Sequence, residues 1–212
     1  MSIIFLLLWI ATLAGLYWAV RNNRQMGLFG SWPVPLVRAD QAHPAFEIGP
    51  FGPNLSTEVK FIGRGNLRVI GGTSDAETWI LAVLAKRSTC IFEFGTCTGK
   101  TTYLLAVNSP ANAKISTLTL DPEQAQNYIR EPHDDSDSTK RALTESGFKN
   151  FMYSGTDVEQ KIHQYFGDSK QFDEEQLAGK CDLVFIDGSH VYSYVTSDTE
   201  KAFRMLAPGG VI

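Results

Sequence analysis

Short apolar runs alternate with longer segments of helical spacing along the second half of the chain. Apolar runs of three to six residues predict strands, and apolar positions that recur every three or four residues predict helices. The strands are expected at residues 91–94, 115–120, 151–153 and 183–186, with a fifth that starts at residue 211. The helices are expected at residues 74–86, 100–107, 139–146, 158–166 and 192–206. This order predicts an α/β fold, a Rossmann-like parallel sheet with helices on both faces.

The first of these helices carries its own start signal. Ser74 and Glu77 fit a capping box, in which each residue satisfies a free backbone N–H of the other. In parallel sheets of this kind, ligands bind outside the carboxyl ends of the strands. The positions that follow the predicted strands are therefore the candidates for function, namely residues 93–99, 121, 154–157 and 187–190.

An almost unbroken apolar run, residues 3–20, stands near the start of the chain. At about 1.5 Å per residue it reaches across a hydrocarbon core of roughly 30 Å. Tyr17 and Trp18 stand at its end, where an aromatic belt is expected, and the basic residues Arg21 and Arg24 follow. No charge precedes the run, so a secretory signal does not fit. The run predicts a single-pass N-terminal membrane anchor with the α/β domain in the cytoplasm; the alternative is a helix buried in the protein or in an oligomer interface.

Residues 22–72 are irregular and rich in Pro and Gly, which predicts a linker and N-terminal extension with short strands at most. Such a segment either packs over a functional site as part of its wall or serves only as a spacer. The expected organisation is an anchor at residues 1–24, a linker or extension at residues 25–72 and the α/β domain at residues 73–212.

The composition of the 212 residues suits one globular domain with a full core and a short appendage, since 43% are hydrophobic and 20% are charged. The net charge of −4 gives no long-range attraction to nucleic acid, so a nucleic-acid partner is not expected. Cys90, Cys97 and Cys181 lie in or beside apolar strand-like runs and lack the spacing of a metal site. They are expected to be reduced core thiols in a cytosolic compartment.

A Gly-rich turn lies between a predicted strand and a predicted helix, within residues 90–102. The Gly-Lys-Thr at residues 99–101 suggests a phosphate-binding P-loop, but that motif needs four residues between its first Gly and the Gly-Lys pair. The preceding Gly95 leaves only three. The dinucleotide fingerprint also fails, because Cys97 stands in place of its second Gly. A P-loop-like nucleotide-binding protein is kept as an alternative function.

The turn fits instead an acid-x-Gly-x-x-x-Gly pattern formed by Glu93, Gly95 and Gly99. Gly95 permits a tight turn, and Gly99 permits close approach of a ligand to the helix start. A carboxylate at this place repels a pyrophosphate and attracts a cationic amine. Asp121 ends the next strand, where a carboxylate can accept hydrogen bonds from ribose hydroxyls. A ligand with a ribose and an ammonium group but no phosphate is S-adenosyl-L-methionine.

Four motifs together resemble the class I S-adenosylmethionine-dependent methyltransferases. They are Glu-Phe-Gly-Thr-Cys-Thr-Gly-Lys-Thr-Thr at 93–102, Leu-Asp-Pro-Glu at 120–123, Cys-Asp-Leu-Val-Phe-Ile-Asp-Gly-Ser-His at 181–190 and Leu-Ala-Pro-Gly-Gly at 206–210. The resemblance covers residues 74–212 and looks closest to the small-molecule O-methyltransferase branch. It implies an enzyme that transfers a methyl group to a small-molecule acceptor, expected at a hydroxyl. It implies cofactor contacts from Glu93, Gly95, Thr96 and Gly99 at the methionine end, Asp121 at the ribose, and Gly155, Thr156 and Asp157 near the adenine.

The chain departs from that family in two ways. Cys97 replaces the middle Gly of the usual loop, at a position that varies in the small-molecule branch. The family also continues past the Pro-Gly-Gly motif with a full fifth strand and a hairpin of two more strands, and these C-terminal strands are missing from the sequence given. The expectation is a fragment of a longer protein, or a partner that covers the sheet edge.

Asp187 and His190 are the candidate catalytic residues, because Asp-Gly-Ser-His places a carboxylate and an imidazole on one loop at the carboxyl edge. Methyl transfer is an in-line displacement at a sulfonium carbon, so positioning and removal of the acceptor proton are the tasks left to the protein. An imidazole ordinarily titrates near neutral pH, which suits His190 as that base. Asp187 either binds a divalent metal such as Mg²⁺ or orients the cofactor or His190. The alternative for His190 is a structural role at a helix N-terminus.

The remaining polar candidates are expected at the surface. His43, His133 and His163 are predicted surface residues, and Asp198 is predicted on a solvated helix face. A non-catalytic binding module on the same fold is a third interpretation, because the missing strands normally form part of the substrate pocket. The sequence does not identify the methyl acceptor, the metal dependence or whether the chain forms a homo-oligomer.

Overall fold

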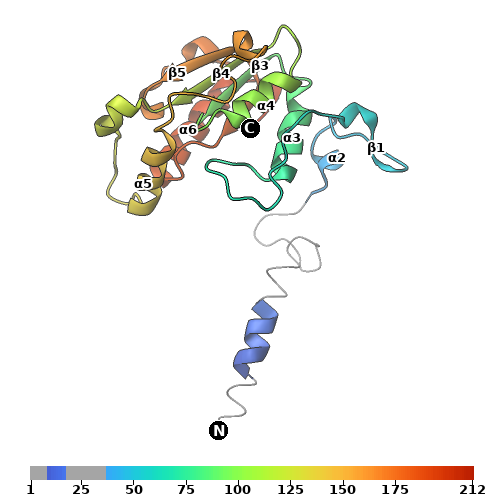
Figure 1. The fold of residues 1–212 in the computed structure, drawn as a ribbon, viewed down its shortest axis with the longest axis horizontal. Coiled ribbons are helices and arrows are strands. Elements are labelled where there is room, and N and C mark those ends of the chain that lie inside the picture. The colour runs from blue at the N-terminus through green and yellow to red at the C-terminus, as the bar shows by residue number, and fades with distance from the viewer. Residues whose placement is uncertain (1–8, 18–36) are drawn as a thin grey trace.

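The central feature of the fold is a five-stranded parallel sheet with the order β5-β4-β3-β6-β7. The computed structural model describes residues 9–17 and 37–212 (Figure 1). The strands are β3 (Cys90–Phe94), β4 (Lys114–Thr119), β5 (Ile162–Phe166), β6 (Cys181–Ile186) and β7 (Leu206–Val211). The chain starts the sheet in the middle at β3, proceeds outward to β4 and β5, and then returns to β6 and β7 on the other side. The switch point, where ligands bind in open α/β sheets, therefore lies between β3 and β6.

Helices pack on both faces of this sheet, as the sequence predicted (Figure 1). The helices within residues 37–212 are α2 (Ala39–Ala42), α3 (Asp75–Ala85), α4 (Lys100–Asn108), α5 (Ser136–Glu145) and α6 (Tyr192–Met205). Of these, α3 and α4 pack on one face of the sheet and α6 on the other. A small antiparallel pair, β1 (Ile48–Gly49) and β2 (Gly52–Pro53), lies between α2 and α3 in the chain. The 3-10 turns are η1 (Leu55–Thr57), η2 (Pro122–Asn127), η3 (Glu159–Lys161), η4 (Ser169–Gln171) and η5 (Glu175–Leu177).

Alternate residues of the central strands send their side chains to opposite faces of the sheet. Ile91, Ile115 and Leu183 pack with residues of α3 and α4 in one buried cluster. Phe92 and Val184 pack with residues of α6 in a second cluster. Each such side chain contributes about 1.5–3 kcal/mol when fully buried. Burial on both faces explains why these strands are continuous apolar runs in the sequence.

The start of α3 is fixed by the predicted capping box. The Ser74 hydroxyl accepts a hydrogen bond from the Glu77 N–H at 3.2 Å, and the Glu77 carboxylate accepts one from the Ser74 N–H at 2.7 Å. Two N–H groups that a helix start leaves free are thereby satisfied. The local prediction is confirmed at this helix.

The outer strand β5 is not where the sequence predicted a strand. Residues 151–153 form turns, and residues 162–166, expected within a helix at 158–166, form β5. This strand pairs in parallel with β4, with Ile162 opposite Ile115. Residues 151–153 are continuously apolar, whereas residues 162–166 are interrupted by His163 and Gln164, so the pattern favoured the segment that does not enter the sheet. The prediction of a strand at 151–153 and a helix at 158–166 is wrong.

The aromatic run at 151–153 packs instead over the turn that follows β3. The Phe151 and Tyr153 rings stack with centroids 5.3 Å apart. They approach Gly99 so closely that a Cβ there would lie 2.8 Å from the Phe151 Cβ. The aromatic pair therefore requires a residue without a side chain at the start of α4.

The C-terminal strand is longer than predicted. α6 ends at Met205, and β7 follows at once in parallel pairing with β6. The sequence predicted a helix to residue 206 and a strand from residue 211. The register shifts between Cys181 and Leu183, because the Pro-Gly-Gly segment of β7 places extra residues opposite β6. Such irregularity hides a strand from a pattern search.

The predicted membrane anchor, residues 3–20, lies only partly within the described residues. Residues 9–17 form a helix with exposed side chains. Within residues 9–17 and 37–212, no helix is long and apolar enough to span a bilayer. The transmembrane helix thus finds no support in the described part of the chain. The boundaries expected between anchor, linker and α/β domain, at residues 24 and 72, likewise remain predictions.

The turn at Gly95 sets a strict test of this fold. Gly95 has φ of +98°, and a Cβ at this position would lie 2.3 Å from the Asp187 carbonyl oxygen. Gly155 has φ of +74° and open space around it. Gly95→Ala is expected to reduce the free energy of unfolding by about 3 kcal/mol or more, through backbone strain plus overpacking. Gly155→Ala, with strain alone, is expected to cost about 1–2 kcal/mol.

Urea unfolding of the two variants beside the unmodified chain measures this difference. Equal losses of stability in the two variants would show that the close approach of Gly95 to Asp187 is not a constraint on the fold.

Candidate functional site

A cavity of about 800 Å³ opens at the carboxyl edge of the sheet, around the switch point between β3 and β6. Its lining includes residues 95–98 after β3, residues 118–120 at the end of β4, residues 167–169 after β5 and residues 187–190 after β6. A volume of this size is typical of small-molecule and cofactor sites. The sequence correctly located the candidate site at this edge.

The turn after β3 is held rigidly at the cavity wall. Thr96 is buried, and its hydroxyl lies 2.8 Å from the Thr117 hydroxyl and accepts a hydrogen bond from the Gln164 amide at 3.1 Å. Cys97 has φ of +44°, the one positive φ of a non-Gly residue in the described part of the chain. Burial raises the pKa of its thiol to about 11, so Cys97 stays neutral in the cavity wall. Gly99, at φ of +74°, is the N-cap of α4 and does not line the cavity.

Glu93 lies behind this turn rather than in the cavity. Its side chain is fully buried, and one carboxylate oxygen accepts hydrogen bonds from the hydroxyls of Thr102 and Thr117. The other oxygen has no hydrogen-bond partner among the described residues. The pKa of Glu93 is raised to about 7, mainly by burial; the hydroxyls of Thr102 and Thr117 act against this rise, and the nearby charge of Asp187 adds to it.

The sequence predicted that Glu93 lines the methionine end of a cofactor. In the structure Gly95 and Thr96 line the cavity, whereas the Glu93 side chain points toward α4 and β4 and supports the turn from inside. The physical reason is strand alternation, which places Glu93 on the same face as Thr117, its neighbour across the sheet.

Asp121 stands just past β4, next to cavity residues 119–120. Its carboxylate accepts a hydrogen bond from the Glu123 N–H at 2.9 Å and so caps η2. Asp121 itself does not line the cavity in this conformation. Its predicted contact with a ribose remains a prediction.

Thr156 and Asp157 lie in the turn before β5 and do not line the cavity. The Thr156 hydroxyl donates to the Tyr153 carbonyl at 2.6 Å and closes that turn locally. Their placement near an adenine followed from the strand assigned to 151–153. Since the strand is β5, the loop that reaches the cavity is residues 167–169, which the sequence reasoning missed for this reason.

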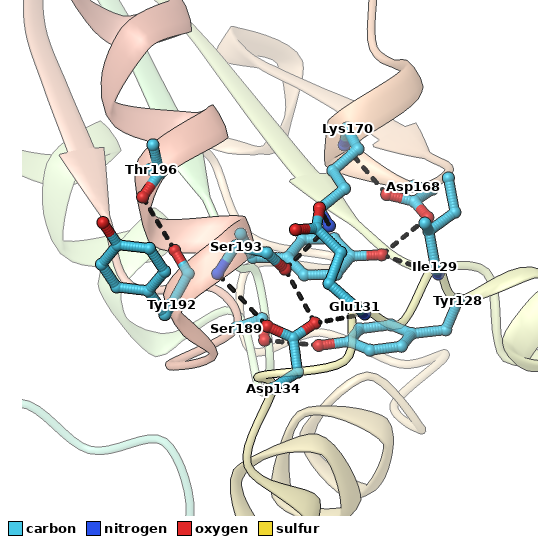
Figure 2. Close-up of polar contacts among 11 residues, drawn as sticks. Tyr128, Ile129, Glu131, Asp134, Asp168, Lys170, Ser189, Tyr192, Ser193 and Thr196 are labelled. Atoms are coloured by element: carbon cyan, nitrogen blue, oxygen red, sulfur yellow. Dashed lines mark hydrogen bonds and ion pairs between the residues drawn. The ribbon is translucent and has the colours of Figure 1, made fainter.

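Asp168 is the buried acid of that missed loop (Figure 2). It accepts hydrogen bonds from the Tyr194 hydroxyl at 2.7 Å and from the Lys170 N–H at 2.9 Å. The Lys170 ammonium lies 4.5 Å from the centre of the Tyr194 ring and donates to the Ser193 hydroxyl at 2.7 Å. These contacts tie the loop after β5 to the first turn of α6.

The segment before α5 is fastened over the same end of the cavity (Figure 2). The Tyr128 ring stacks on the Tyr194 ring with centroids 4.5 Å apart, and the Tyr128 hydroxyl lies 2.7 Å from the Ser189 hydroxyl. Asp134 accepts a hydrogen bond from the Ser193 hydroxyl at 2.8 Å. This segment therefore makes specific contacts with α6.

Asp187 and His190 both line the cavity on the loop after β6, as the sequence predicted. The Asp187 N–H donates to the Phe94 carbonyl at 2.9 Å, which fixes this loop against the end of β3. Burial raises the pKa of Asp187 to about 6, and the charge of His190 acts in the opposite direction. His190 is exposed at the cavity mouth, just before α6. The geometry brings the pair together, while their catalytic roles remain predictions.

The donor set for a metal ion is not assembled around Asp187. Across residues 9–17 and 37–212, no three His, Cys, Asp or Glu side chains are grouped so as to hold a metal. The described residues thus do not fit the predicted divalent metal, and its binding by Asp187 remains a prediction only.

Asp198 is buried, so its prediction as a solvated residue is wrong. It is 1% exposed and lines the cavity, and one of its carboxylate oxygens has no partner among the described residues. Burial raises its pKa to about 6. Asp198 lies four residues after Tyr194, on the face of α6 that packs against the sheet, and the sequence pattern did not reveal that face.

The N-terminal extension forms part of the cavity wall. Ala42, His43 and Phe46 line it together with the α3 residues Ile80 and Leu84. His43 was predicted at the surface, but it is half-buried there, and its Nδ1 accepts a hydrogen bond from the Ala45 N–H at 3.1 Å. This end of the cavity is largely apolar. His133 and His163 are exposed, as predicted.

Comparison with known proteins gives a family match over the second half of the chain. The sequence profile described as "Methyltransferase domain" matches residues 92–212. No curated protein matches the chain.

Solved structures also align with the chain. The O-methyltransferase TomG from Streptomyces achromogenes, in complex with SAM, is 21% identical with a TM-score of 0.43, over 66% of this chain and 54% of that one. The SAH-bound methyltransferase PaMTH1 of Podospora anserina is 16% identical with a TM-score of 0.42, over 66% and 52%. An O-methyltransferase from Bacillus cereus in complex with SAH is 20% identical with a TM-score of 0.43, over 66% and 56%. The chain thus spans about half the length of these proteins.

Glu93 makes the stability of the fold depend on pH. Its pKa is about 7 in the folded chain, against about 4.3 in an unfolded chain. The protonated form is therefore favoured by folding, and this contribution is complete below pH ~4.3 and is lost as the pH rises through about 7. The unmodified chain is expected to lose about 3 kcal/mol relative to Glu93→Gln over that interval. Denaturant unfolding at a series of pH values measures the difference.

Glu77→Gln is the matched control, because hydrogen bonds from Ser74 lower the pKa of Glu77. Above the unfolded pKa of the Glu77 carboxyl, Glu77→Gln is expected to be less stable than the unmodified chain, whereas Glu93→Gln is expected to be more stable than it. Identical pH profiles for Glu93→Gln and the unmodified chain would refute the assignment of Glu93.

Proposed function

Because the chain belongs to the methyltransferase-domain family, we propose that it binds S-adenosyl-L-methionine in the cavity and transfers its methyl group to a hydroxyl of a small molecule. The observation that carries this proposal is the position of the cavity. It lies at the switch point of the parallel sheet, beside a turn too short to wrap a phosphate and next to the half-buried acid Asp187.

The charge of the cavity favours a cationic ligand. Five acidic side chains line it, against two basic side chains, Lys100 and Arg141. The acids are Glu77, Glu145, Asp168, Asp187 and Asp198. A sulfonium or ammonium group is attracted by this field, and a polyphosphate is repelled. The proposed cofactor carries both cations and no phosphate.

The two ends of the cavity suggest how the reactants are divided. The end formed by η4, α6 and the segment at Tyr128 is rich in hydroxyls and carboxylates, which suits a nucleoside. Phe46, Ile80 and Leu84 supply apolar lining, which suits the body of an acceptor molecule. The turn at residues 95–98 also lines the cavity, and the transferred methyl group is assigned to its side.

Methyl transfer then follows from alignment and proton removal. The acceptor oxygen attacks the methyl carbon in line with the sulfonium, so that an O–C bond forms as the S–C bond breaks. His190 accepts the hydroxyl proton, and the half-buried Asp187 stabilises the resulting imidazolium. The products are the methyl ether and S-adenosylhomocysteine. A divalent metal at Asp187 takes no part in this scheme.

Calorimetric titration of the chain with S-adenosylmethionine tests the cofactor assignment. One molecule is expected to bind per chain. Asp168→Asn removes the negative charge of a lining residue in the loop after β5. It is expected to reduce the affinity for S-adenosylmethionine about tenfold, which corresponds to a loss of about 1.4 kcal/mol of binding free energy. The matched control Asp157→Asn, which lies outside the cavity lining, is expected to leave affinity within about twofold.

Two results would contradict the assignment. One is the absence of binding to a folded chain, as judged by circular dichroism. The other is tight binding of Mg-ATP that Lys100→Ala abolishes, which would favour the P-loop alternative.

We also propose that residues 3–20 anchor the chain in a membrane, with the α/β domain on the cytoplasmic side. The proposal rests on the uninterrupted apolar sequence, on Arg21 and Arg24 beyond it, and on the exposure of Trp9 and Leu16 in the described helix at 9–17.

Removal of residues 1–24 is expected to move the protein from the membrane pellet to the supernatant after cell fractionation, because the apolar run is lost. A salt wash of the full-length chain serves as the control, since salt releases proteins held by charge alone. Release by salt, or continued sedimentation of the shortened chain with membranes, would count against the anchor.

A further inference from the structure

Two cysteines meet at the amino edge of the sheet, on the side opposite the cavity. Cys90 is the first residue of β3, and Cys181 is the first residue of β6, its parallel neighbour. Their sulfur atoms lie 3.7 Å apart, within hydrogen-bond distance for thiols. Neither residue lines the cavity. The methyl-transfer scheme therefore makes no use of this pair.

The surroundings give the two thiols different access to solvent. Cys181 is completely buried, whereas Cys90 is half-buried. A reagent in solution therefore reaches Cys90 first. The Asp182 carboxylate accepts hydrogen bonds from the N–H groups of Thr89 and Cys90 at 2.7 Å and 3.0 Å, which fixes the start of β3 beside β6. The sulfur atoms are thus held together by a rigid backbone.

The hydrogen bond between the two thiols favours a thiolate at Cys90. The hydrogen bond with Cys181 is the largest effect and lowers the pKa of Cys90 to about 7, with help from Lys180 and Lys114 and against burial and Asp182. The same hydrogen bond raises the pKa of Cys181, so the proton stays there. A thiolate is the reactive form of cysteine.

We propose that Cys90 and Cys181 form an oxidation site at which a peroxide converts the two adjacent thiols into an intramolecular disulfide. The inference is independent of the proposed methyl transfer. Exposure selects Cys90 as the attacking thiol and proximity selects Cys181 as the resolving thiol.

The chemistry balances with peroxide as the oxidant. The Cys90 thiolate attacks one peroxide oxygen, the O–O bond breaks, and Cys90 becomes a sulfenic acid while hydroxide leaves and takes a proton from solvent to give one water. The Cys181 sulfur then attacks the Cys90 sulfur, the S–O bond breaks, and a second water carries away the thiol proton. The two thiols lose two electrons, and the peroxide gains them. The sulfur atoms need only close from 3.7 Å to about 2 Å, a change that side-chain rotation can contribute to.

Cys97 supplies an internal control for this site. It is the third cysteine, it lies at the opposite edge of the sheet in the cavity wall, and burial raises the pKa of its thiol to about 11. It is expected to remain a thiol under conditions that oxidise the pair.

The experiment is peroxide treatment of the full-length folded chain, followed by denaturation and alkylation with N-ethylmaleimide. The treated chain is expected to take up one maleimide instead of three and to lose the mass of two hydrogen atoms. A protease digest is expected to contain a peptide pair joined through Cys90 and Cys181 that separates on reduction. Cys97→Ser is expected to form the same pair, and Cys181→Ala none.

Three results would overturn the proposal. They are uptake of three maleimides after treatment, a disulfide that includes Cys97, and disulfide-linked dimers in place of the intramolecular product. The peptide map of the unmodified chain decides among them without any variant, so a variant that fails to fold does not remove the test.

Discussion

The close approach of two backbone segments at Gly95 is the constraint on which the site depends. The turn after β3 and the loop after β6 pass so near each other that a single added Cβ would overlap the Asp187 carbonyl. Hydrogen bonds from the Gly95 N–H to the Leu118 carbonyl and from the Asp187 N–H to the Phe94 carbonyl hold the segments there. The cavity at this edge has its shape because these two loops meet without an intervening side chain.

Much of the fold could be predicted because its signals are local. The capping box at Ser74, the apolar central strands and the acid-ended strand before Asp187 all carry their information within a few residues. Strand β5 could not be identified in this way, because His163 and Gln164 interrupt its apolar pattern while the run at 151–153 is continuously apolar. The residues at 151–153 pack over Gly99 instead, and that contact is tertiary. The error moved the predicted adenine contacts to Thr156 and Asp157 and away from residues 167–169.

In the candidate site too, local signals could be predicted from the sequence and tertiary contacts could not. Gly95, Thr96, Asp187 and His190 could be predicted to line it, because each directly follows a central strand. Asp198 and His43 could not, because their position depends on which face of α6 meets the sheet and on how the extension folds back. Glu93 was recognised as important, but a sequence pattern cannot distinguish an acid that lines a cavity from one that supports the wall from behind. Along a strand, a shift of one residue moves a side chain from one face of the sheet to the other.

The extension gives the cavity a wall that the central sheet alone would lack. Ala42, His43 and Phe46 line the cavity, so a segment that could have been a spacer is part of the site. Phe46 also packs with Leu81 and Leu84 in the core, which fixes the extension against α3. The interpretation as a non-catalytic module assumed that the missing C-terminal strands leave the substrate pocket incomplete, and the extension supplies part of the pocket wall instead.

The buried carboxyl of Glu93 links the contents of the cavity to the proton balance of the solvent. Near neutral pH this group is only partly ionised, and the charge of Asp187 is one of the reasons. A cation held against Asp187 offsets that charge and makes ionisation of Glu93 easier. Binding of a positively charged ligand is then accompanied by release of a fraction of a proton to the solvent. When the ligand dissociates, the same fraction of a proton is taken up again. The acid behind the turn thus acts as a counter-charge that adjusts to whether the cavity is filled.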